Sequence, residues 1–240
     1  MAIINERWPI DLAPKTCVFG RTRNDAPQIS PVTRKRKIIR RGRPLWSAKC
    51  TWELPNTERL ARLRFLLESL DGFNGSAQLW DFASPYPAGL TLATPGDVES
   101  ERLYWTHLGV RSPWTWAGMP SHWTAGATVS ASAGAAGATS VTLSGLAPNS
   151  IAAVQGQYVQ IGRRLYLAAA GAMSDAGGVA TVQITPGLIS AVSAGTTSRL
   201  VFAACEMQLA EQDFDSSATA GDGAVSISAT FIESVEDVTA

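Results

Sequence analysis

Apolar and polar residues alternate strictly over residues 46–54, and this alternation sets the strongest limit on the fold. The apolar positions fall on one face of an extended chain and are Trp46, Ala48, Cys50, Trp52 and Leu54. A period of two is typical of a half-buried β-strand. Residues 201–209 and 225–231 alternate in the same way. The pattern therefore predicts a mainly β protein.

Shorter alternating segments predict further strands in the middle of the chain. Their apolar positions are Val141 and Leu143, Val159 and Ile161, Leu165 and Leu167, and Ala180, Val182 and Ile184. Residues 162–164 form a plausible hairpin turn and residues 175–178 a plausible loop, because glycine and aspartate favour such connections.

One stretch has the period of an amphipathic α-helix. Its apolar stripe consists of Leu60, Leu63, Leu67 and Leu70, widened by Leu66. The arginines off this stripe are Arg59, Arg62 and Arg64. Asn56 or Thr57 is a suitable N-cap, the helix dipole favours Glu58, and Gly72 is a natural stop. The sequence therefore predicts one helix that packs its leucines against the strands.

Composition limits the class of protein. The 240-residue chain is 45% hydrophobic and 17% charged, so it can bury a core and is not intrinsically disordered. No apolar run approaches the ~18 residues of a transmembrane helix, so no membrane insertion is expected. Glu6, Arg7 and Pro9 interrupt the opening segment, which therefore does not resemble a secretory signal. We expect a protein made in a cytoplasm.

Residues that catalyse reactions or bind metals are sparse. His107 and His122 lack metal-ligand spacing, and neither a phosphate-binding loop nor a nucleophile elbow is present. Asp213 and Asp215 could hold a hard cation, but a solvated acidic turn or a salt-bridged interface is the favoured interpretation. We therefore expect no enzyme activity, no catalytic residues, no cofactor and no metal site.

The three cysteines bear on the redox environment. They are Cys17, Cys50 and Cys205. Because they are odd in number, far apart in the sequence and never spaced as a metal-binding pair, a disulfide framework or a zinc site is not expected. A reducing compartment fits this cysteine usage best.

Composition shifts along the chain predict two domains. All eight tryptophans lie between Trp8 and Trp123, whereas residues 124–198 are dominated by small residues and carry almost no charge. The region after residue 199 is acidic and strand-like. We therefore expect a discontinuous outer β domain of residues 1–106 and 200–240, with an inserted β-rich peripheral domain of residues 107–199.

Charge is also divided, although the net charge is zero. Residues 1–64 hold fifteen of the twenty basic residues and five of the twenty acids, a net charge of +10, so residues 65–240 carry −10. Seven basic residues form one run: Arg34, Lys35, Arg36, Lys37, Arg40, Arg41 and Arg43. The run could bind phosphates, but no nucleic-acid-binding signature accompanies it. Docking onto an acidic protein surface is favoured, and the candidate acids are Glu206, Glu211, Asp213 and Asp215.

A group of aromatic residues offers a second candidate site. Its tryptophans are Trp105, Trp114, Trp116 and Trp123. Indole rings stack on sugars, bury large areas in protein interfaces and pack well in cores. The group therefore predicts internal packing, a partner platform or a glycan-binding platform, in that order.

Several segments together resemble a known family. Trp46 and Trp52 on a strand precede the helix, and the segments 70–75, 77–82 and 84–87 follow as a glycine-marked turn, a strand and a proline-rich end. The segments 156–166, 175–178 and 180–186 resemble a β-rich module of phage tail-tip proteins. The closing strand, 225–233, is similar to the last strand of tail-tube-like domains. The chain thus resembles the distal tail proteins of tailed phages.

This resemblance implies a fold and a function. The implied fold is a tail-tube-like β-sandwich or barrel with one flanking α-helix, plus an inserted small β-barrel-like domain. The implied function is that of a structural adaptor at the virion tail tip, assembled in the cytoplasm of the host bacterium. Its partners would be copies of itself in a hexameric ring, the tail tube protein and the hub or baseplate protein. The alternative is a carbohydrate-binding tail-tip module that contacts the host surface.

Overall fold

The computed structural model shows a mainly β protein, and the residues that it describes include one α-helix and one closed barrel. It describes residues 6–23, 25–29, 36–40, 43–55, 58–84, 104–107, 110–113, 115–116, 119–120, 129–146, 148–149, 151–211, 215–218 and 224–234. The expected fold class, mainly β with a flanking helix and a small barrel, is confirmed at this level.

The chain divides into two compact units. Unit 1 comprises Met1–Phe82 and Glu206–Ala240, and unit 2 comprises Ala83–Cys205. Composition shifts had suggested boundaries at 106/107 and 199/200, and both differ from these positions. The strand that ends the first part of unit 1 is β6 (Ala77–Trp80), and the next described strands do not join its sheet. Tryptophans continue after β6 as far as Trp123, so the tryptophan-rich composition gives no sign of the boundary after Phe82.

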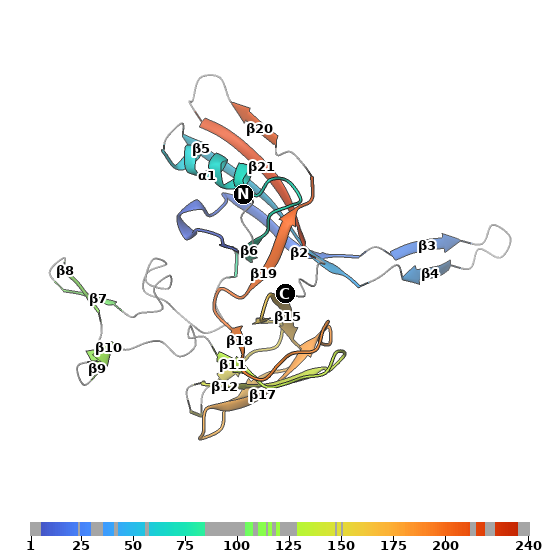
Figure 1. Cartoon of the computed structure of the whole chain (residues 1–240), viewed down its shortest axis with the longest axis vertical. Helices are drawn as coiled ribbons and strands as arrows, with labels where there is room; N and C mark the ends of the chain where they lie inside the picture. Colours follow the sequence, from blue (N-terminus) through green and yellow to red (C-terminus); the bar gives the residue numbers. More distant parts are fainter. Residues whose placement is uncertain are drawn as a thin grey trace. The chain divides into compact units, whose positions relative to one another are not determined.

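A seven-stranded sheet forms the centre of unit 1 (Figure 1). Its strand order is β1 (Glu6–Arg7), β6, β19 (Ala204–Leu209), β21 (Ala224–Glu233), β5 (Leu45–Pro55) and β2 (Thr16–Thr22), with β20 (Asp215–Ala218) also paired to β21. β5 lies in the middle of two long antiparallel ladders, one with β2 and one with β21. The predicted alternation is confirmed, because Trp46, Ala48, Cys50, Trp52 and Leu54 are all buried.

The β2–β5 ladder continues into a second hairpin ladder. It ends at the pair Thr22↔Leu45, and the pairing resumes at Asp25↔Arg40 between β3 (Asp25–Ile29) and β4 (Arg36–Arg40). The two ladders are therefore nested, with β3 and β4 forming a two-stranded sheet of their own (Figure 1). We call the β3–β4 ladder the basic arm.

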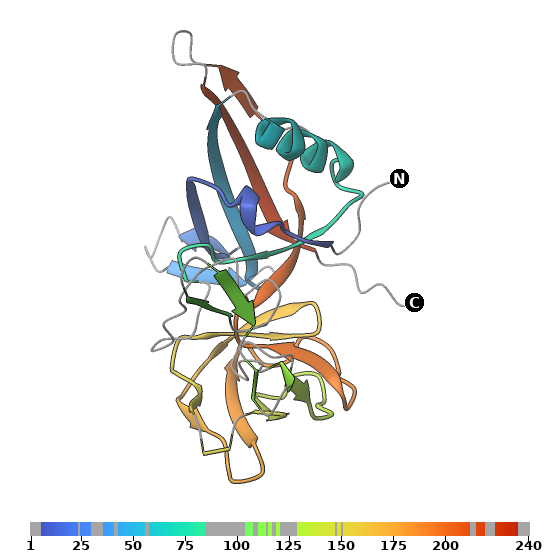
Figure 2. The ribbon, with the colours of Figure 1, turned by 90° about the vertical axis from the view of Figure 1, so that its left-hand side faces the viewer.

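The helix α1 (Glu58–Ser69) packs against β5 and lies along the sheet of unit 1 (Figure 2). The predicted stripe is confirmed, since Leu60, Leu63, Leu67 and Leu70 are each at most 2% exposed. Arg59, Arg62 and Arg64 are exposed, as expected for residues off the stripe. The chain turns after the helix through Asp71 and Gly72, which both have positive φ. The expected N-caps, Asn56 and Thr57, lie outside the described residues.

Unit 2 contains a closed antiparallel barrel of six strands. Their order is β11 (Val129–Ala131), β12 (Ser140–Ser144), β17 (Val179–Thr185), β15 (Arg164–Ala168), β14 (Tyr158–Ile161) and β18 (Thr196–Arg199), which pairs back to β11. The predicted inward residues of β12, β14 and β17 all lie in one apolar cluster. Short two-stranded ladders complete the unit: β7 (Tyr104–His107) with β8 (Val110–Pro113), β9 (Thr115–Trp116) with β10 (Met119–Pro120), and β13 (Ile151–Ala153) with β16 (Ala172–Met173).

The strand predicted around Leu165 and Leu167 is present as β15, and its residues in the barrel cluster are Tyr166 and Ala168 rather than these leucines. A turn at Gly162 and Arg163 pairs Ile161 with Arg164, and this register sets Tyr166 opposite Val159. Residues that face each other in an antiparallel ladder share one side of the sheet. Tyr166 therefore lies on the inner side because Val159 does.

Candidate interaction surfaces

The predicted basic run forms most of one strand of the basic arm. Arg36, Lys37 and Arg40 lie in β4, paired with Ile29, Gln28 and Asp25. The side chains of β4 are outside the described part of the structure, and so are Arg34, Lys35 and Arg41. The interpretation of this run as a docking surface therefore stays a prediction.

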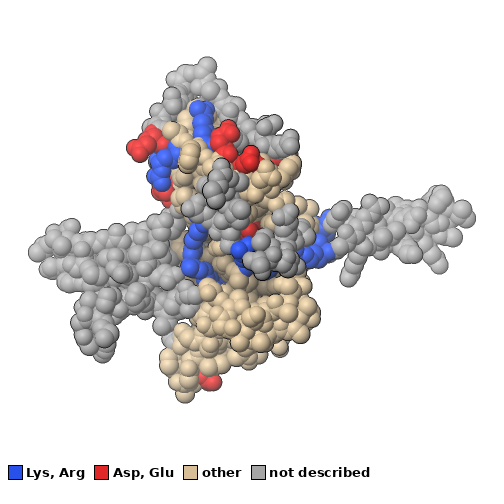
Figure 3. Space-filling model, viewed as in Figure 1, with Lys and Arg blue, Asp and Glu red and all other residues tan. Residues whose placement is uncertain are grey.

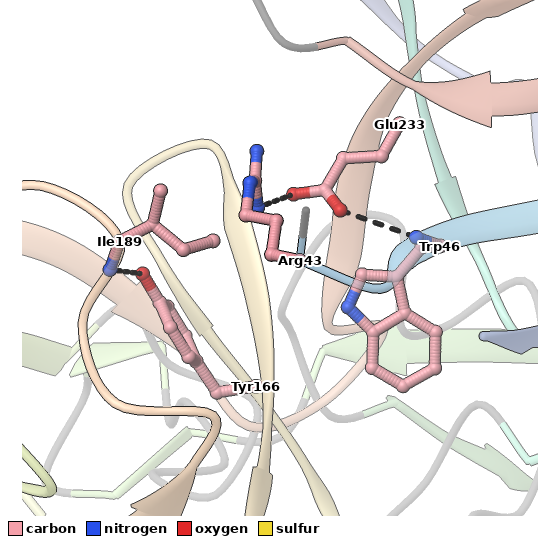
Figure 4. A network of polar contacts seen from close by, with 5 residues as sticks. All are labelled: Arg43, Trp46, Tyr166, Ile189 and Glu233. Atoms are coloured by element: carbon pink, nitrogen blue, oxygen red, sulfur yellow. Dashed lines mark hydrogen bonds and ion pairs between the residues drawn. The ribbon is translucent and has the colours of Figure 1, made fainter. Parts of the chain in front are cut away.

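Arg43, the last residue of the run, is bonded within its own unit (Figure 4). Its Nη1 lies 3.1 Å from Oε1 of Glu233, and the backbone N–H of Trp46 donates to Oε2 of the same carboxylate at 3.1 Å. Glu233 is 1% exposed, so the Glu233 carboxylate depends on these donors for its stability. The pair joins the start of β5 to the end of β21.

Further positive charge surrounds this pair at the base of the basic arm. Burial lowers the pKa of Arg21, and the charges of Arg23 and Arg43 lower it further, while Glu233 raises it. The Arg21 guanidinium also lies over the Trp46 ring, 5.6 Å from its centroid. Arg21 thus interacts electrostatically with two further arginines, Arg23 and Arg43, and with one buried carboxylate, Glu233, so positive charge exceeds negative charge in this group.

Of the four predicted acidic residues, the structure describes the side chains of Glu206 and Glu211. Glu206 is only 7% exposed, and its Oε1 accepts a hydrogen bond from Ser76 Oγ at 2.7 Å. Its carboxylate is therefore held inside the protein. Glu211 is exposed. Asp213 lies outside the described residues, as does the side chain of Asp215, which begins β20.

The predicted tryptophan platform cannot be assembled from described side chains. Trp105 lies in β7, paired with Ser112, and Trp116 lies in β9, paired with Met119. Trp114 and Trp123 lie outside the described residues, and so do the side chains of Trp105 and Trp116. The glycan or partner platform stays a prediction from sequence.

The outer edge of the seven-stranded sheet is a surface that the sequence did not indicate. β2 has seven residues and pairs only with β5 among the described strands. Val18, in the middle of β2, is 73% exposed. An edge strand of this length presents a row of backbone N–H and C=O groups that can pair with another strand. Its only sequence signal is the short β-prone segment 17–19.

A second surface is an apolar groove of about 400 Å³ along α1. Its lining residues are Pro9, Leu12, Glu58, Ala61, Arg62, Phe65 and Leu66. Phe65 is 73% exposed, whereas Arg62 is held at the rim by Asp11 Oδ2, 2.5 Å from its Nη1. The groove therefore combines an exposed aromatic ring with a fixed ion pair.

Charged side chains are unevenly distributed over the two units. On the face shown in Figure 3, the described lysine, arginine, aspartate and glutamate residues gather on unit 1, while the barrel face is almost uncharged.

In the described part of the chain, no group of three or more His, Cys, Asp or Glu residues could hold a metal ion. Across the same residues, no helix is both long and apolar enough to cross a membrane.

Cysteine positions are a further feature that sequence spacing did not reveal. Cys17 and Cys50 are opposite each other in the β2–β5 ladder, and their sulfur atoms are 3.2 Å apart. Cys17, Cys50 and Cys205 are all free thiols. Cys17 and Cys50 are far apart in the sequence, and only the register of β2 with β5 brings them together.

Comparison with known proteins adds no relationship: the chain matches no family model and no curated protein.

Proposed function

We propose that the protein is a non-catalytic structural protein of a tailed phage or phage-like particle. In this proposal it is a distal tail protein, an adaptor at the tail tip whose hexameric ring joins the tail tube protein to the hub or baseplate protein. It would assemble in the cytoplasm of the host bacterium and remain in the virion. The proposal rests on the sequence resemblance and on the surfaces of unit 1.

One observation carries the assembly part of the proposal: the sheet of unit 1 ends at β2 in a long strand with an exposed apolar side chain at Val18. A ring needs two different surfaces on every subunit, because each copy contacts the next head to tail. The two edges of this sheet differ, since β2 has seven residues and β1 only two. We propose that β2 of one subunit extends the sheet of its neighbour.

Charge gives this contact its orientation. The basic arm continues directly from the β2–β5 ladder, so a neighbour at the β2 edge also lies beside the arm. Because Glu206 is buried and bonded to Ser76, the acids proposed to meet the arm are Glu211, Asp213 and Asp215. Exposed ion pairs each contribute only ~0–1 kcal/mol. Strand pairing therefore holds the ring, and charge selects its register.

The mass of the protein in solution tests the proposal. Size-exclusion chromatography with light scattering should give a multiple of the 25.4 kDa chain, a hexamer or a double ring, alone or after addition of candidate tube and hub proteins. A strict monomer under all of these conditions contradicts a ring-forming adaptor. A monomer that also binds sugars on a glycan array supports the carbohydrate-binding alternative instead.

A further inference from the structure

Cys17 and Cys50 form a close pair across the β2–β5 ladder. Their Cα atoms are directly opposite in register, and residues so placed point to the same side of the sheet. Their sulfur atoms are 3.2 Å apart, and a disulfide needs about 2.0 Å. Opposite residues in an antiparallel ladder have Cα atoms ~4.5–5.5 Å apart, which is within the range of disulfides.

The two thiols differ in acidity and in access to solvent. The hydrogen bond from Cys50 lowers the pKa of Cys17, although burial and the charge of Asp81 oppose this effect. The same hydrogen bond raises the pKa of Cys50, and burial raises it further. Cys17 is partly exposed, whereas Cys50 is fully buried. Cys17 is therefore the thiolate that a small oxidant in solution can reach.

We propose that Cys17 and Cys50 are an oxidation site, at which a hydroperoxide converts the free thiols into a cross-strand disulfide between β2 and β5. This site rests on the strand register and the sulfur–sulfur distance, and it does not depend on the proposed function.

The chemistry proceeds in two balanced steps. The Cys17 thiolate attacks one oxygen of hydrogen peroxide; an S–O bond forms, the O–O bond breaks, and the leaving hydroxide takes up a proton to become water. The Cys50 sulfur then attacks the Cys17 sulfur of this sulfenic acid; the S–S bond forms, the S–O bond breaks, and hydroxide leaves with the Cys50 proton as a second water. Two thiols lose two electrons, and one peroxide is reduced to two waters.

The position of the pair gives the disulfide a structural consequence. Cys17 and Cys50 are 33 residues apart, and the residues between them include the whole basic arm. A bond between them closes that segment into a covalent loop and ties the edge strand β2 to the centre of the sheet. The oxidised protein should therefore have a higher melting temperature than the reduced protein.

Peptide mapping of the full-length protein tests the proposal directly. Trypsin cuts after lysine and arginine, so the three cysteines fall in three different peptides, residues 16–21, 50–59 and 200–240. After treatment with hydrogen peroxide, unfolding and alkylation, two of the three thiols should be lost, and peptides 16–21 and 50–59 should be linked until dithiothreitol is added. Persistent free thiols at Cys17 and Cys50, or a link that involves Cys205, overturn the proposal.

Serine variants separate the roles of the two sulfurs. Cys17→Ser should leave Cys50 reduced, because the remaining thiol is buried. Cys50→Ser should let Cys17 oxidise beyond the sulfenic acid, since no second sulfur is there to attack it. Cys205→Ser is the matched control and should form the disulfide at the wild-type rate. Loss of two thiols from Cys17→Ser contradicts the assignment, and mapping of the wild-type protein decides the matter if a variant does not fold.

Discussion

Trp8 and Trp52 donate their indole N–H groups to the same acceptor, the carbonyl oxygen of Leu12, at 3.0 and 2.8 Å. Their rings are stacked with centroids 5.6 Å apart, and Phe231 meets the Trp8 ring edge-on. A carbonyl oxygen has two lone pairs, and both are used here. The shared carbonyl oxygen fastens the N-terminal segment to β5, and the ring contact between Trp8 and Phe231 adds a link to β21.

Trp52→Phe should destabilise unit 1 by about 2–4 kcal/mol, because it removes a buried hydrogen bond and leaves a cavity. Urea unfolding measures this loss. Phe65→Ala is the control at an exposed aromatic residue and should change the free energy of unfolding by about 0.5 kcal/mol or less. Equal losses in both variants contradict the role given to the Leu12 carbonyl.

Local periodicity was sufficient to predict the elements whose burial pattern is regular. β5 and α1 each bury one face over ten or more residues, so Trp52 and Leu63 could be placed in the core from spacing alone. β15 is different, because Leu165 and Tyr166 are both buried and only the register with β14 decides which one faces the barrel core. A short strand whose two faces are both buried shows no alternation of apolar and polar residues. Its core-facing side therefore cannot be predicted from the sequence.

Features that depend on pairing between distant segments could not be predicted from the sequence. Cys17 meets Cys50 only through the β2–β5 register, and β2 itself has a weak sequence signal. Glu206 was expected on an acidic surface because charge was counted along the chain. It is buried, and Ser76 donates a hydrogen bond to its carboxylate. Counting charges gives no information on which face of a strand a carboxylate occupies.

Gly178 is required in the barrel for two separate reasons. Its φ is +72°, and a Cβ there would lie 2.2 Å from the carbonyl oxygen of Leu146. Gly178→Ala should therefore destabilise the barrel by more than about 2 kcal/mol. Gly156→Ala is a matched control, because its φ is +84° but no atom lies within 4 Å of the added Cβ, so about 1 kcal/mol is expected. Thermal unfolding of both variants measures the difference, and similar losses rule out the steric contribution.

Cys17 should react with iodoacetamide at lower pH in the folded protein than in the unfolded protein. Alkylation requires the thiolate, and the hydrogen bond from Cys50 lowers the pKa of Cys17. The lowered pKa increases the thiolate fraction near neutral pH. Cys50→Ala removes the donor and should shift the pH profile of Cys17 upward, whereas Cys205→Ser should leave it unchanged. A folded-state profile at or above the unfolded one contradicts this assignment.

Val18→Lys should prevent assembly while leaving the subunit folded. A lysine on an edge strand opposes pairing with another strand because its charge would have to be buried in the contact. Val18 is 73% exposed but lies opposite Lys49 in the β2–β5 ladder, so the change should lower the free energy of unfolding by about 1 kcal/mol or less. Ile151→Lys is the matched control in unit 2, at 67% exposure, and should assemble normally. Light scattering gives the mass of each variant, and a Val18→Lys ring of normal mass removes β2 from the interface.

Reversing charges of the basic run, in and next to the basic arm, should also weaken assembly, but for a different reason. The triple variant Arg34→Glu, Arg36→Glu and Arg41→Glu keeps the β2 edge and replaces attraction to the neighbour's acids by repulsion. Because such pairs are screened by salt, ring formation by the variant should recover partly at high ionic strength. Val18→Lys should show no such recovery, since a buried lysine disrupts strand pairing at any salt concentration.

A control variant with Arg64→Glu, Arg163→Glu and Arg164→Glu makes the same change in net charge away from the arm. This control should assemble like the wild type. If the arm variant forms rings as well as this control does at low salt, charge docking is excluded. Strand pairing then remains as the sole basis of the ring.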